Sequence, residues 1–189
     1  MNIHALRMMH EKTWRESYPH FITVINRFDL KVGAEVGVAF GGHAEAILEQ
    51  TGVARLVGVD PYLHSPDYDD MLNLPQPDFD CMFWYTIGRL SRFGDRYMHV
   101  RSPSIEAVNC ISGTADFVYI DANHSYEAVK QDILLWLPKI RPGGIVGGHD
   151  FAPEFPGVRQ AVQELCSQKG LEIHLEPASV WWVQLPAGS

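Results

Sequence analysis

The clearest indication of the fold is GAEVGVAFGGHAEAIL, residues 33–48. An apolar run over residues 32–38 is typical of a strand; it contains Gly37, and the Gly41-Gly42 pair follows it. A helical pattern over residues 43–50 comes directly after the pair. Glycine has no Cβ, so such a turn lets the backbone approach a ligand closely, and the first N–H groups of the helix would face that ligand.

The spacing of these glycines is unlike that of a dinucleotide site. A dinucleotide-binding turn has the pattern G-x-G-x-x-G, whereas this chain has G-x-x-x-G-G from Gly37 onward. Glu35 lies inside the strand, where a carboxylate suits a ligand with a cationic group better than one with two phosphates. Asp60 ends the next predicted strand, where an acid can accept both hydroxyls of a ribose. Together these residues predict a nucleoside-binding site.

Outward from this stretch, strands and helices alternate along the chain, which is typical of a parallel sheet covered on both faces. The link between the last two strands is too short for a crossover helix, so these two strands must be antiparallel. The predicted fold class is therefore α/β: a Rossmann-like, doubly wound, seven-stranded sheet, mostly parallel with an antiparallel C-terminal strand pair. The predicted strands are residues 32–38, 55–60, 97–101, 116–121, 142–149, 171–174 and 180–185.

The length of 189 residues predicts a single domain over residues 1–189. Within it we expect an N-terminal helical segment over residues 1–30, helical from about residue 5 to residue 28. Residues 61–95 interrupt the alternation with a loop rich in Pro, Asp and Tyr and a helix over 79–93. Long loops in compact domains tend to be functional, so this insertion either merely covers the sheet or also lines a substrate pocket.

Composition limits the class of protein and its partners. Apolar residues make up 46% of the chain and charged residues 20%, as in soluble globular proteins. The net charge of −8, with scattered Lys and Arg, argues against a nucleic-acid partner. No apolar run reaches the roughly 20 residues of a membrane span, and the first residues lack the apolar stretch of a signal peptide. We therefore expect a cytoplasmic protein with no membrane partner, and the sequence leaves its oligomeric state open.

These motifs, together with Y-I-D at 119–121 and P-G-G at 142–144, resemble the class I S-adenosylmethionine-dependent methyltransferases. The resemblance covers roughly residues 32–168 and is strongest to small-molecule enzymes of the catechol O-methyltransferase-like and antibiotic-sugar types. Ala39 departs from it, because many members have a second glycine there. The resemblance implies S-adenosylmethionine as cofactor and O-methylation of a small-molecule acceptor. It also implies cofactor-binding roles for Glu35, Gly37, Gly41, Asp60, Ser102 (beside the adenine) and Asp121 (at the methionine amino group).

Four ionisable residues follow the fourth and fifth predicted strands: Asp121, His124, His149 and Asp150. The carboxyl ends of parallel strands meet at one edge of a sheet, so these side chains should converge. Two interpretations stay open. Either Asp121, His149 and Asp150 bind a divalent cation such as Mg²⁺ or Mn²⁺, or no metal binds and His124 or His149 is the base that deprotonates the acceptor hydroxyl.

Three alternatives compete with this interpretation. In a purely structural one, Asn123 or Ser125 caps the following helix and the two histidines are solvated loop residues. An NAD-dependent oxidoreductase on a similar sheet is disfavoured by the glycine spacing and by the antiparallel C-terminal pair. A catalytically silent nucleoside-binding domain is the third. We also expect Gly147 and Gly148, which are small where a strand usually carries aliphatic residues, to make room for the acceptor.

Overall fold

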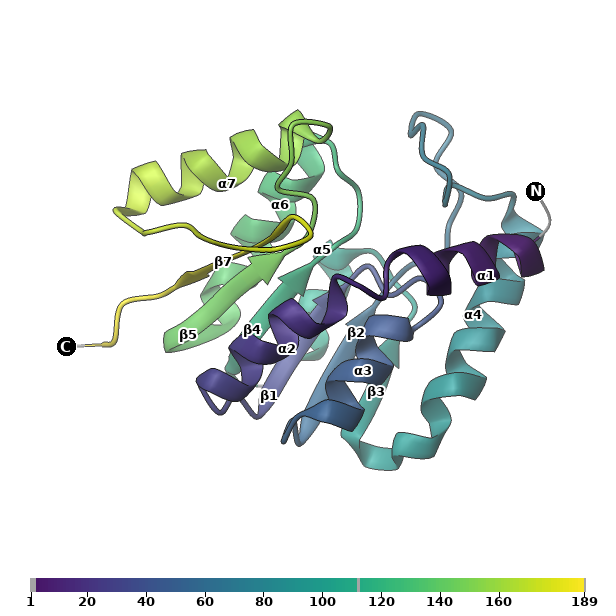
Figure 1. The fold of residues 1–189 in the computed structure, drawn as a ribbon, viewed down its shortest axis with the longest axis horizontal. Helices are drawn as coiled ribbons and strands as arrows, with labels where there is room; N and C mark the ends of the chain where they lie inside the picture. Colours follow the sequence, from purple (N-terminus) through teal and green to yellow (C-terminus); the bar gives the residue numbers. More distant parts are fainter. Residues whose placement is uncertain (1–2, 112, 189) are drawn as a thin grey trace.

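The computed structural model describes residues 3–111 and 113–188. In this part of the chain, seven strands form one sheet in the order β3-β2-β1-β4-β5-β7-β6, with helices on both faces (Figure 1). The strands are β1 (Val32–Val36), β2 (Arg55–Val59), β3 (Tyr97–Val100), β4 (Ala115–Ile120), β5 (Ile140–Gly148), β6 (His174–Glu176) and β7 (Val180–Gln184). The helices are α1 (Ile3–Thr13), α2 (Tyr18–Arg27), α3 (Gly42–Gln50), α4 (Gln76–Leu90), α5 (Ser104–Ala107), α6 (Tyr126–Trp136) and α7 (Pro156–Lys169).

The pairing of the strands confirms the predicted fold class. Strands β3, β2, β1, β4 and β5 pair in parallel, whereas β7 pairs antiparallel with both β5 and β6. Apart from Glu35 in β1, the central strands are largely apolar because both faces of the sheet are covered. In β4, Phe117 and Tyr119 pack on the side of α2 and α3, while Val118 and Ile120 pack on the side of α5, α6 and α7.

Several elements differ from their predicted boundaries. The inserted helix, predicted over 79–93, is α4 at Gln76–Leu90, and the first strand, predicted over 32–38, ends at Val36. The opening segment, predicted as one helical stretch over 5–28, is two helices, and Pro19 lies in the first turn of the second. The sixth strand, predicted over 171–174, instead spans His174–Glu176. Its position is set by the turn that follows, where Ala178 and Ser179 have positive φ angles and bring β6 directly against β7. A strand paired through a tight turn must lie next to that turn.

The prediction that Gly147 and Gly148 make room for the acceptor is wrong. A Cβ on Gly147 would lie 2.5 Å from a ring carbon of Phe21, and one on Gly148 would lie 2.3 Å from the carbonyl oxygen of Ile120. Neither glycine is among the described residues that line the main cavity. Their small size serves the close packing of β5 against helix α2 and against the neighbouring strands.

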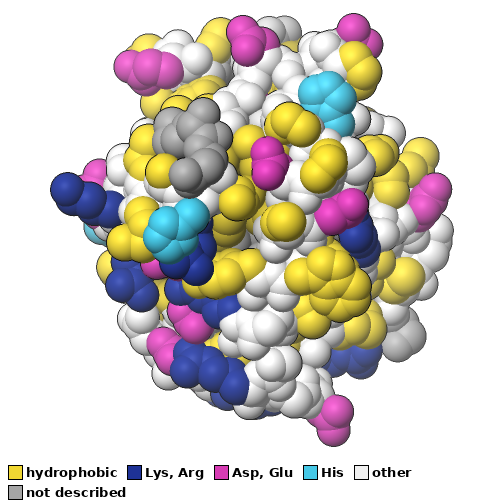
Figure 2. Space-filling view, turned by 90° about the vertical axis from the view of Figure 1, so that its right-hand side faces the viewer, with side chains coloured by type: hydrophobic (Ala, Val, Ile, Leu, Met, Phe, Trp, Pro, Cys, Tyr) yellow, Lys and Arg dark blue, Asp and Glu magenta, His cyan; other side chains and the backbone are white. Residues whose placement is uncertain are grey.

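The N-terminal helix and the insertion lie at one side of the molecule. Figure 2 shows this side, on which apolar side chains lie among scattered acidic and basic ones. Several large apolar side chains of α1, of the loop over residues 61–75 and of α4 are well exposed: Met8, Leu63, Met71 and Trp84. None of the helices described here is both long enough and apolar enough to cross a membrane.

Candidate active site

A cavity of about 770 Å³ lies at the carboxyl ends of β1, β2, β4 and β5. Helix α1, the loop over residues 61–75 and the start of α4 contribute the outer part of its lining. It brings together seven of the residues predicted from sequence: Glu35, Gly37, Asp60, Asp121, His124, His149 and Asp150. Gly41 and Ser102 are not among the described lining residues.

The glycine turn after β1 is packed between the end of β2 and the end of β4. Gly37 has φ +89°, and its N–H donates to the carbonyl oxygen of Val59 at 2.9 Å. A Cβ at this position would lie 2.0 Å from the carbonyl oxygen of Asp121. Glycine is therefore required here by backbone packing as well as by any ligand. Gly41, also at positive φ, precedes α3 and packs against α4, which gives it a structural role.

Asp60 connects the loops after β1 and β2 through hydrogen bonds. Its Oδ2 accepts the N–H groups of Val38 and Ala39, both at 3.0 Å, and its Oδ1 accepts the N–H of Tyr62 at 2.9 Å. Burial raises the pKa of Asp60, and the three N–H groups oppose that rise. A carboxylate oxygen has two lone pairs, so Oδ1 retains acceptor capacity toward the cavity. Its predicted contact with a ribose stays a prediction.

Glu35 and His43 form a buried pair beside the glycine turn. Glu35 Oε1 lies 2.8 Å from His43 Nδ1, and the two side chains are only 2% and 8% exposed. Burial raises the pKa of Glu35, against the effect of its contact with His43. The other polar atoms of the pair, Glu35 Oε2 and His43 Nε2, are buried and have no hydrogen-bond partner among the described residues. The sequence analysis did not identify His43.

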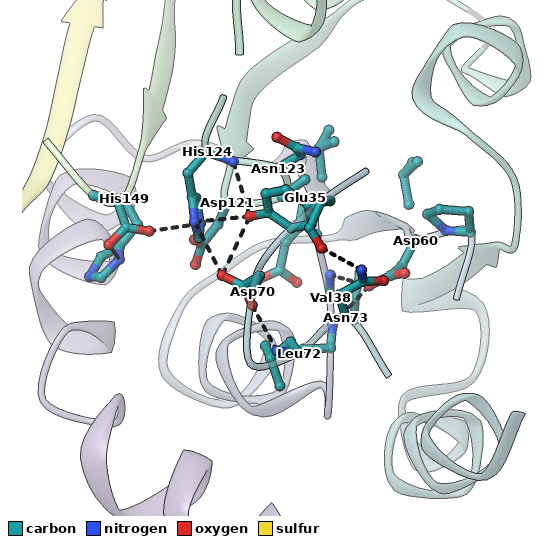
Figure 3. A pocket seen from close by; sticks show the side chains of 18 of the residues that line it. Glu35, Val38, Asp60, Asp70, Leu72, Asn73, Asp121, Asn123, His124 and His149 are labelled. Atoms are coloured by element: carbon teal, nitrogen blue, oxygen red, sulfur yellow. Dashed lines mark hydrogen bonds and ion pairs between the residues drawn. The ribbon is translucent and has the colours of Figure 1, made fainter. Parts of the chain in front are cut away.

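A cluster of acids and histidines forms the opposite end of the cavity (Figure 3). His124 Nε2 lies 3.0 Å from Asp150 Oδ2 and 4.0 Å from Asp121 Oδ1, and His149 Nδ1 lies 2.9 Å from Asp150 Oδ1. Asp150, at φ +60°, thus holds both histidines. The convergence predicted from the strand ends is what the structure shows.

The acids set the protonation of this cluster. Burial alone would lower the pKa of both histidines, but the hydrogen bonds to Asp150 and the nearby negative charges outweigh it. The pKa of His149 rises to about 9, and that of His124 also rises. Burial would raise the pKa of Asp150, yet the two histidines hold it well below its usual range. Asp150 is therefore an ionised acid that favours the protonated form of both histidines beside it.

The insertion contributes residues that the sequence analysis did not identify. Tyr68 Oη lies 3.1 Å from His124 Nδ1 and accepts the backbone N–H of His124 at 3.2 Å. Asp70 Oδ2 lies 3.7 Å from the same ring nitrogen, and its Oδ1 accepts the N–H of Leu72. Burial raises the pKa of Tyr68 to about 12. The loop therefore lines the pocket as well as covering it. The only sequence signal was its density of Asp and Tyr.

The cavity wall near Ser102 is made by neighbouring residues. The Ser102 hydroxyl donates to Glu106 Oε2 at 2.5 Å, whereas Ser104 lines the cavity and accepts the indole N–H of Trp136 at 2.7 Å. Asp132, on the inner face of α6, lines the cavity too, and burial raises its pKa to about 6. An acid on an otherwise apolar helix face is unusual, so the sequence pattern could have indicated a special role for Asp132.

The structure also brings together a set of possible metal ligands. Asp121, His124 and Asp150 each offer one ligand atom within 4.8 Å of the others. This set contains His124 where the sequence analysis proposed His149, because the ring of His124 lies between the two acids. Two carboxylates and an imidazole suit a divalent ion of the Mn²⁺ type. Ser125 does cap α6, accepting the N–H of Ala128, but His124 still faces the cavity.

Comparisons with known proteins agree with this fold. A protein-family model described as a methyltransferase domain matches residues 30–151. No curated protein sequence matches the chain.

Among solved structures, the chain is similar to a proposed caffeoyl-CoA O-methyltransferase from Staphylococcus aureus, with a TM-score of 0.70 and 14% identity over 99% of this chain and 93% of that one. It is also similar to CalS11, a calicheamicin methyltransferase, with a TM-score of 0.65 and 19% identity over 86% and 76% of the two chains. The SAH-bound methyltransferase PaMTH1 of Podospora anserina has a TM-score of 0.63 and 15% identity over 89% and 76%. At these identities the likeness is one of fold.

Proposed function

The chain belongs to the methyltransferase family whose model spans residues 30–151, and from that premise we propose that it transfers the methyl group of S-adenosylmethionine to a hydroxyl oxygen of a small molecule. One observation carries the proposal. A single cavity holds, at one end, the glycine turn with its acids and, at the other, an acid-held histidine. Simultaneous binding of a cofactor and a hydroxyl acceptor requires both ends of the cavity.

The first end fits the parts of the cofactor. S-Adenosylmethionine joins an adenosine, a cationic sulfonium and an amino acid. Gly37 allows the backbone to approach the ligand, and Asp60 Oδ1 is available to ribose hydroxyls. Glu35 and Asp121 line this part of the cavity with carboxyl groups, which suit a cationic ligand better than a pyrophosphate. Ser104 and Asp132 offer polar atoms to an adenine near the predicted Ser102.

The second end supplies the base. S-Adenosylmethionine, when bound, supplies a methyl group already activated by the sulfonium, so the protein must align and deprotonate the acceptor. His124 Nδ1 accepts the proton of the acceptor hydroxyl at the place where Tyr68 Oη now lies. Asp150 orients the ring through Nε2 and stabilises the imidazolium that forms. His149 contacts the other carboxylate oxygen of Asp150 and acts on His124 through Asp150.

A cation at the Asp121, His124 and Asp150 set is the second candidate for this end. A cation held there would lower the pKa of a hydroxyl bound to it. The two candidates make opposite predictions. If a cation binds, chelation stops turnover and added Mg²⁺ or Mn²⁺ restores it; if His124 acts as the base, chelators have no effect.

Calorimetry and a turnover assay test the proposal. We expect S-adenosylhomocysteine to bind and NAD not to bind. With caffeoyl-CoA and TDP-rhamnose as first acceptors, the substrates that relatives' names indicate, His124→Ala should lower kcat by ~10²–10⁴-fold while leaving S-adenosylhomocysteine affinity nearly unchanged. His20→Ala, outside the cavity, is the matched control. Binding of NAD alone would overturn the proposal. Binding without turnover on any hydroxylated acceptor would instead support a silent nucleoside-binding domain.

A further inference from the structure

At the His124 end of the cavity, the carboxylate of Asp70 has no role in the chemistry above. Its Oδ2 lies 3.7 Å from His124 Nδ1, the nitrogen to which the acceptor proton passes, and Figure 3 shows Asp70 pointing toward that ring. We propose that Asp70 binds an ammonium group of the acceptor, which is an amino alcohol with its amine on the carbon next to the reacting hydroxyl. The inference rests on the proposed function and names its class of acceptor.

The hydroxyl of Tyr68 marks the place that an acceptor hydroxyl can take. It lies 3.1 Å from His124 Nδ1 and 3.4 Å from Asp70 Oδ2, so a single oxygen at this place reaches both groups. A hydroxyl has only one hydrogen to donate, and His124 must receive that hydrogen if it is to act as the base. Asp70 Oδ2 is then left as an acceptor for a second donor on the same ligand.

The loop holds Asp70 in this position. Its Oδ1 accepts the N–H of Leu72 at 2.7 Å, and its carbonyl oxygen accepts the N–H of Asn73 at 3.0 Å. The Asp70 side chain is only 20% exposed, and no Lys or Arg within residues 3–111 and 113–188 forms an ion pair with it. A carboxylate largely removed from water without a cation is unfavourable, so a cationic group on the ligand would stabilise it.

The rest of the lining also suits a cation better than an anion. The described residues that line the cavity include several acids but no Lys or Arg, the side chains that a bound phosphate or carboxylate usually requires. His10 does not replace them, because burial lowers its pKa to about 4 and leaves its ring neutral at pH 7. The phosphates of caffeoyl-CoA or TDP-rhamnose would find no such partner here, so we expect an amino alcohol to be preferred to either.

His10 contributes an independent sign of a ligand in this cavity. It is 8% exposed and lines the cavity, and its Nδ1 is buried with no hydrogen-bond partner among the described residues. A buried polar atom of this kind usually has a partner, which a bound ligand can supply. Since the ring is neutral, it suits an uncharged polar group of the acceptor, such as a further hydroxyl.

The position of the two groups separates the roles of the oxygen and the nitrogen. The hydroxyl oxygen forms the new bond to the methyl carbon, the carbon–sulfur bond breaks with its electron pair left on sulfur, and the hydroxyl proton passes to His124 Nδ1. The ammonium beside Asp70 has no lone pair, so it stays unmethylated. A diol fits the same two groups, but its neutral hydrogen bond to Asp70 is weaker than a charged one. A hydroxy acid would place two carboxylates against each other.

Three probes built on one ring provide the test: trans-2-aminocyclohexanol, trans-cyclohexane-1,2-diol and trans-2-hydroxycyclohexanecarboxylate. In calorimetry on protein saturated with S-adenosylhomocysteine, we expect the amino alcohol to bind about tenfold or more tightly than the diol, and the hydroxy acid to bind least. Asp70→Asn should weaken the amino alcohol by about tenfold and change the diol by less than about threefold. Asparagine keeps an oxygen for the N–H of Leu72, so the loop should retain its path.

Asp67→Asn removes the same charge from an exposed position of the same loop outside the cavity, and this matched control should alter no affinity. If Asp70→Asn does not fold, salt decides the outcome: added NaCl should weaken the amino alcohol and leave the diol unchanged. Equal wild-type affinities for these two probes, equal losses in the variant, or binding of none of the three would overturn the inference and leave the proposed function standing. Failure of wild-type protein to bind S-adenosylhomocysteine would overturn the proposed function itself.

Discussion

Three of the described histidines that line the cavity are held at one ring nitrogen by a carboxylate. His43 is held by Glu35, and His124 and His149 are held by the two oxygens of Asp150. Such a contact fixes the ring and leaves the other nitrogen for a ligand or a substrate. The geometry of single residues therefore divides the cavity into an end at His43 and an end at His124, and the proposed function assigns the first to the cofactor and the second, the reacting end, to the acceptor hydroxyl.

Asp150→Asn should remove the negative charge that orients and stabilises protonated His124. The negative charge of Asp150 raises the pKa of His124, and a base must be unprotonated to act, so wild-type activity should rise with pH above the ordinary range of histidine. In the variant this rise should move to lower pH, and kcat should fall by ~10²-fold or more. The pH profile of kcat measures both effects, with exposed Asp67→Asn as control. An unmoved profile would exclude Asp150 as the partner of the base.

His10 gives the stability a dependence on pH. It is buried in α1 against the rings of Trp14 and Phe40, and burial lowers its pKa from 6.5 to about 4. A lowered folded-state pKa contributes stability above pH 6.5 that is lost as pH falls through 4. Relative to His10→Phe, wild-type protein should therefore lose up to about 3 kcal/mol of unfolding free energy between pH 7 and pH 4. Urea unfolding across this range checks it; a constant difference would contradict it.

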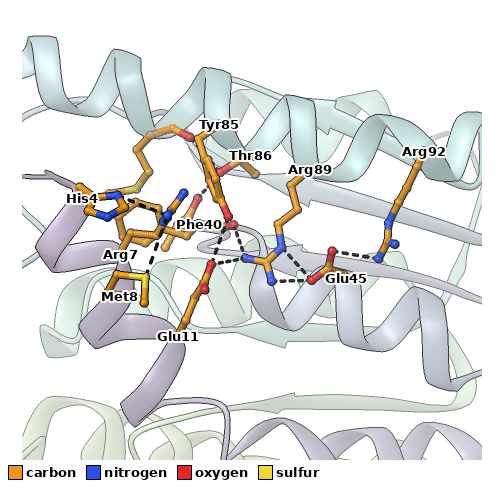
Figure 4. Close-up of polar contacts among 12 residues, drawn as sticks. His4, Arg7, Met8, Glu11, Phe40, Glu45, Tyr85, Thr86, Arg89 and Arg92 are labelled. Carbon is orange, nitrogen blue, oxygen red and sulfur yellow. Dashed lines mark hydrogen bonds and ion pairs between the residues drawn. The ribbon is translucent and has the colours of Figure 1, made fainter.

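Between elements, charged side chains connect the N-terminal helix to α3 and to the turn after β1 (Figure 4). Arg89 of α4 contacts Glu11 of α1 and Glu45 of α3, and it donates to the carbonyl oxygen of Phe40 at 3.3 Å. The Arg89 side chain is only 10% exposed, whereas that of Arg92, which also contacts Glu45, is 52% exposed. Since α1 contributes to the cavity lining, this network determines part of the shape of the site.

Replacing each arginine in turn compares the contribution of a buried ion pair to stability with that of a solvated one. Arg89→Met removes the buried cation between Glu11 and Glu45 and leaves Glu11 without its ion-pair partner, so the unfolding free energy should fall by about 3 kcal/mol. Arg92→Met should lower it by less than about 1 kcal/mol, because a solvated pair contributes little. Urea unfolding measures both variants. Similar losses would show that burial does not distinguish these two contacts.

The turn after β1 gives a second prediction at this scale. Gly37→Ala places a Cβ at positive φ and against the carbonyl oxygen of Asp121, so it should cost more than about 1 kcal/mol and also weaken S-adenosylhomocysteine. The substitution should therefore lower the stability of the fold as well as the affinity for the ligand. Gly88→Ala, on α4 with open space around it, should instead stabilise by about 0.5–1 kcal/mol. Thermal unfolding and calorimetry test the pair, and a fully stable Gly37→Ala would refute the close contact.

For the whole molecule, the sheet order explains where the cavity lies. The chain proceeds outward from β1 through β2 and β3, then returns to the other side of β1 with β4. The loops after β1 and β4 therefore diverge to opposite faces and leave a crevice between them, at the carboxyl ends of the strands. The cavity lies at this switch point.

Hydrogen exchange should report this organisation. We expect the slowest amide exchange in β1, β4 and β5, which are covered on both faces, and rapid exchange in the loop over residues 61–75. S-Adenosylhomocysteine should slow exchange at the ends of β1, β2 and β4 while leaving β6, outside the cavity, unchanged. Protection confined to β6 and β7 would place the ligand elsewhere.

The layers of the fold, the antiparallel end of the sheet and the meeting of Asp121, His124, His149 and Asp150 could all be predicted from the sequence. These features follow from local periodicity, from the length of a link and from the rule that parallel strands end at one edge. Only the tertiary structure decided which side chains touch. It paired His43 with Glu35, and it brought Tyr68 from the insertion to His124.

The tertiary structure also kept Ser102 and Gly41 out of the cavity lining, and it placed His124 rather than His149 between Asp121 and Asp150. The physical reason is one of range. Periodicity and turn chemistry act over a few residues, and they fix each strand and the end of the strand at which its cavity-lining residues lie. The path of a loop across that end depends on packing between distant segments, which no local pattern encodes.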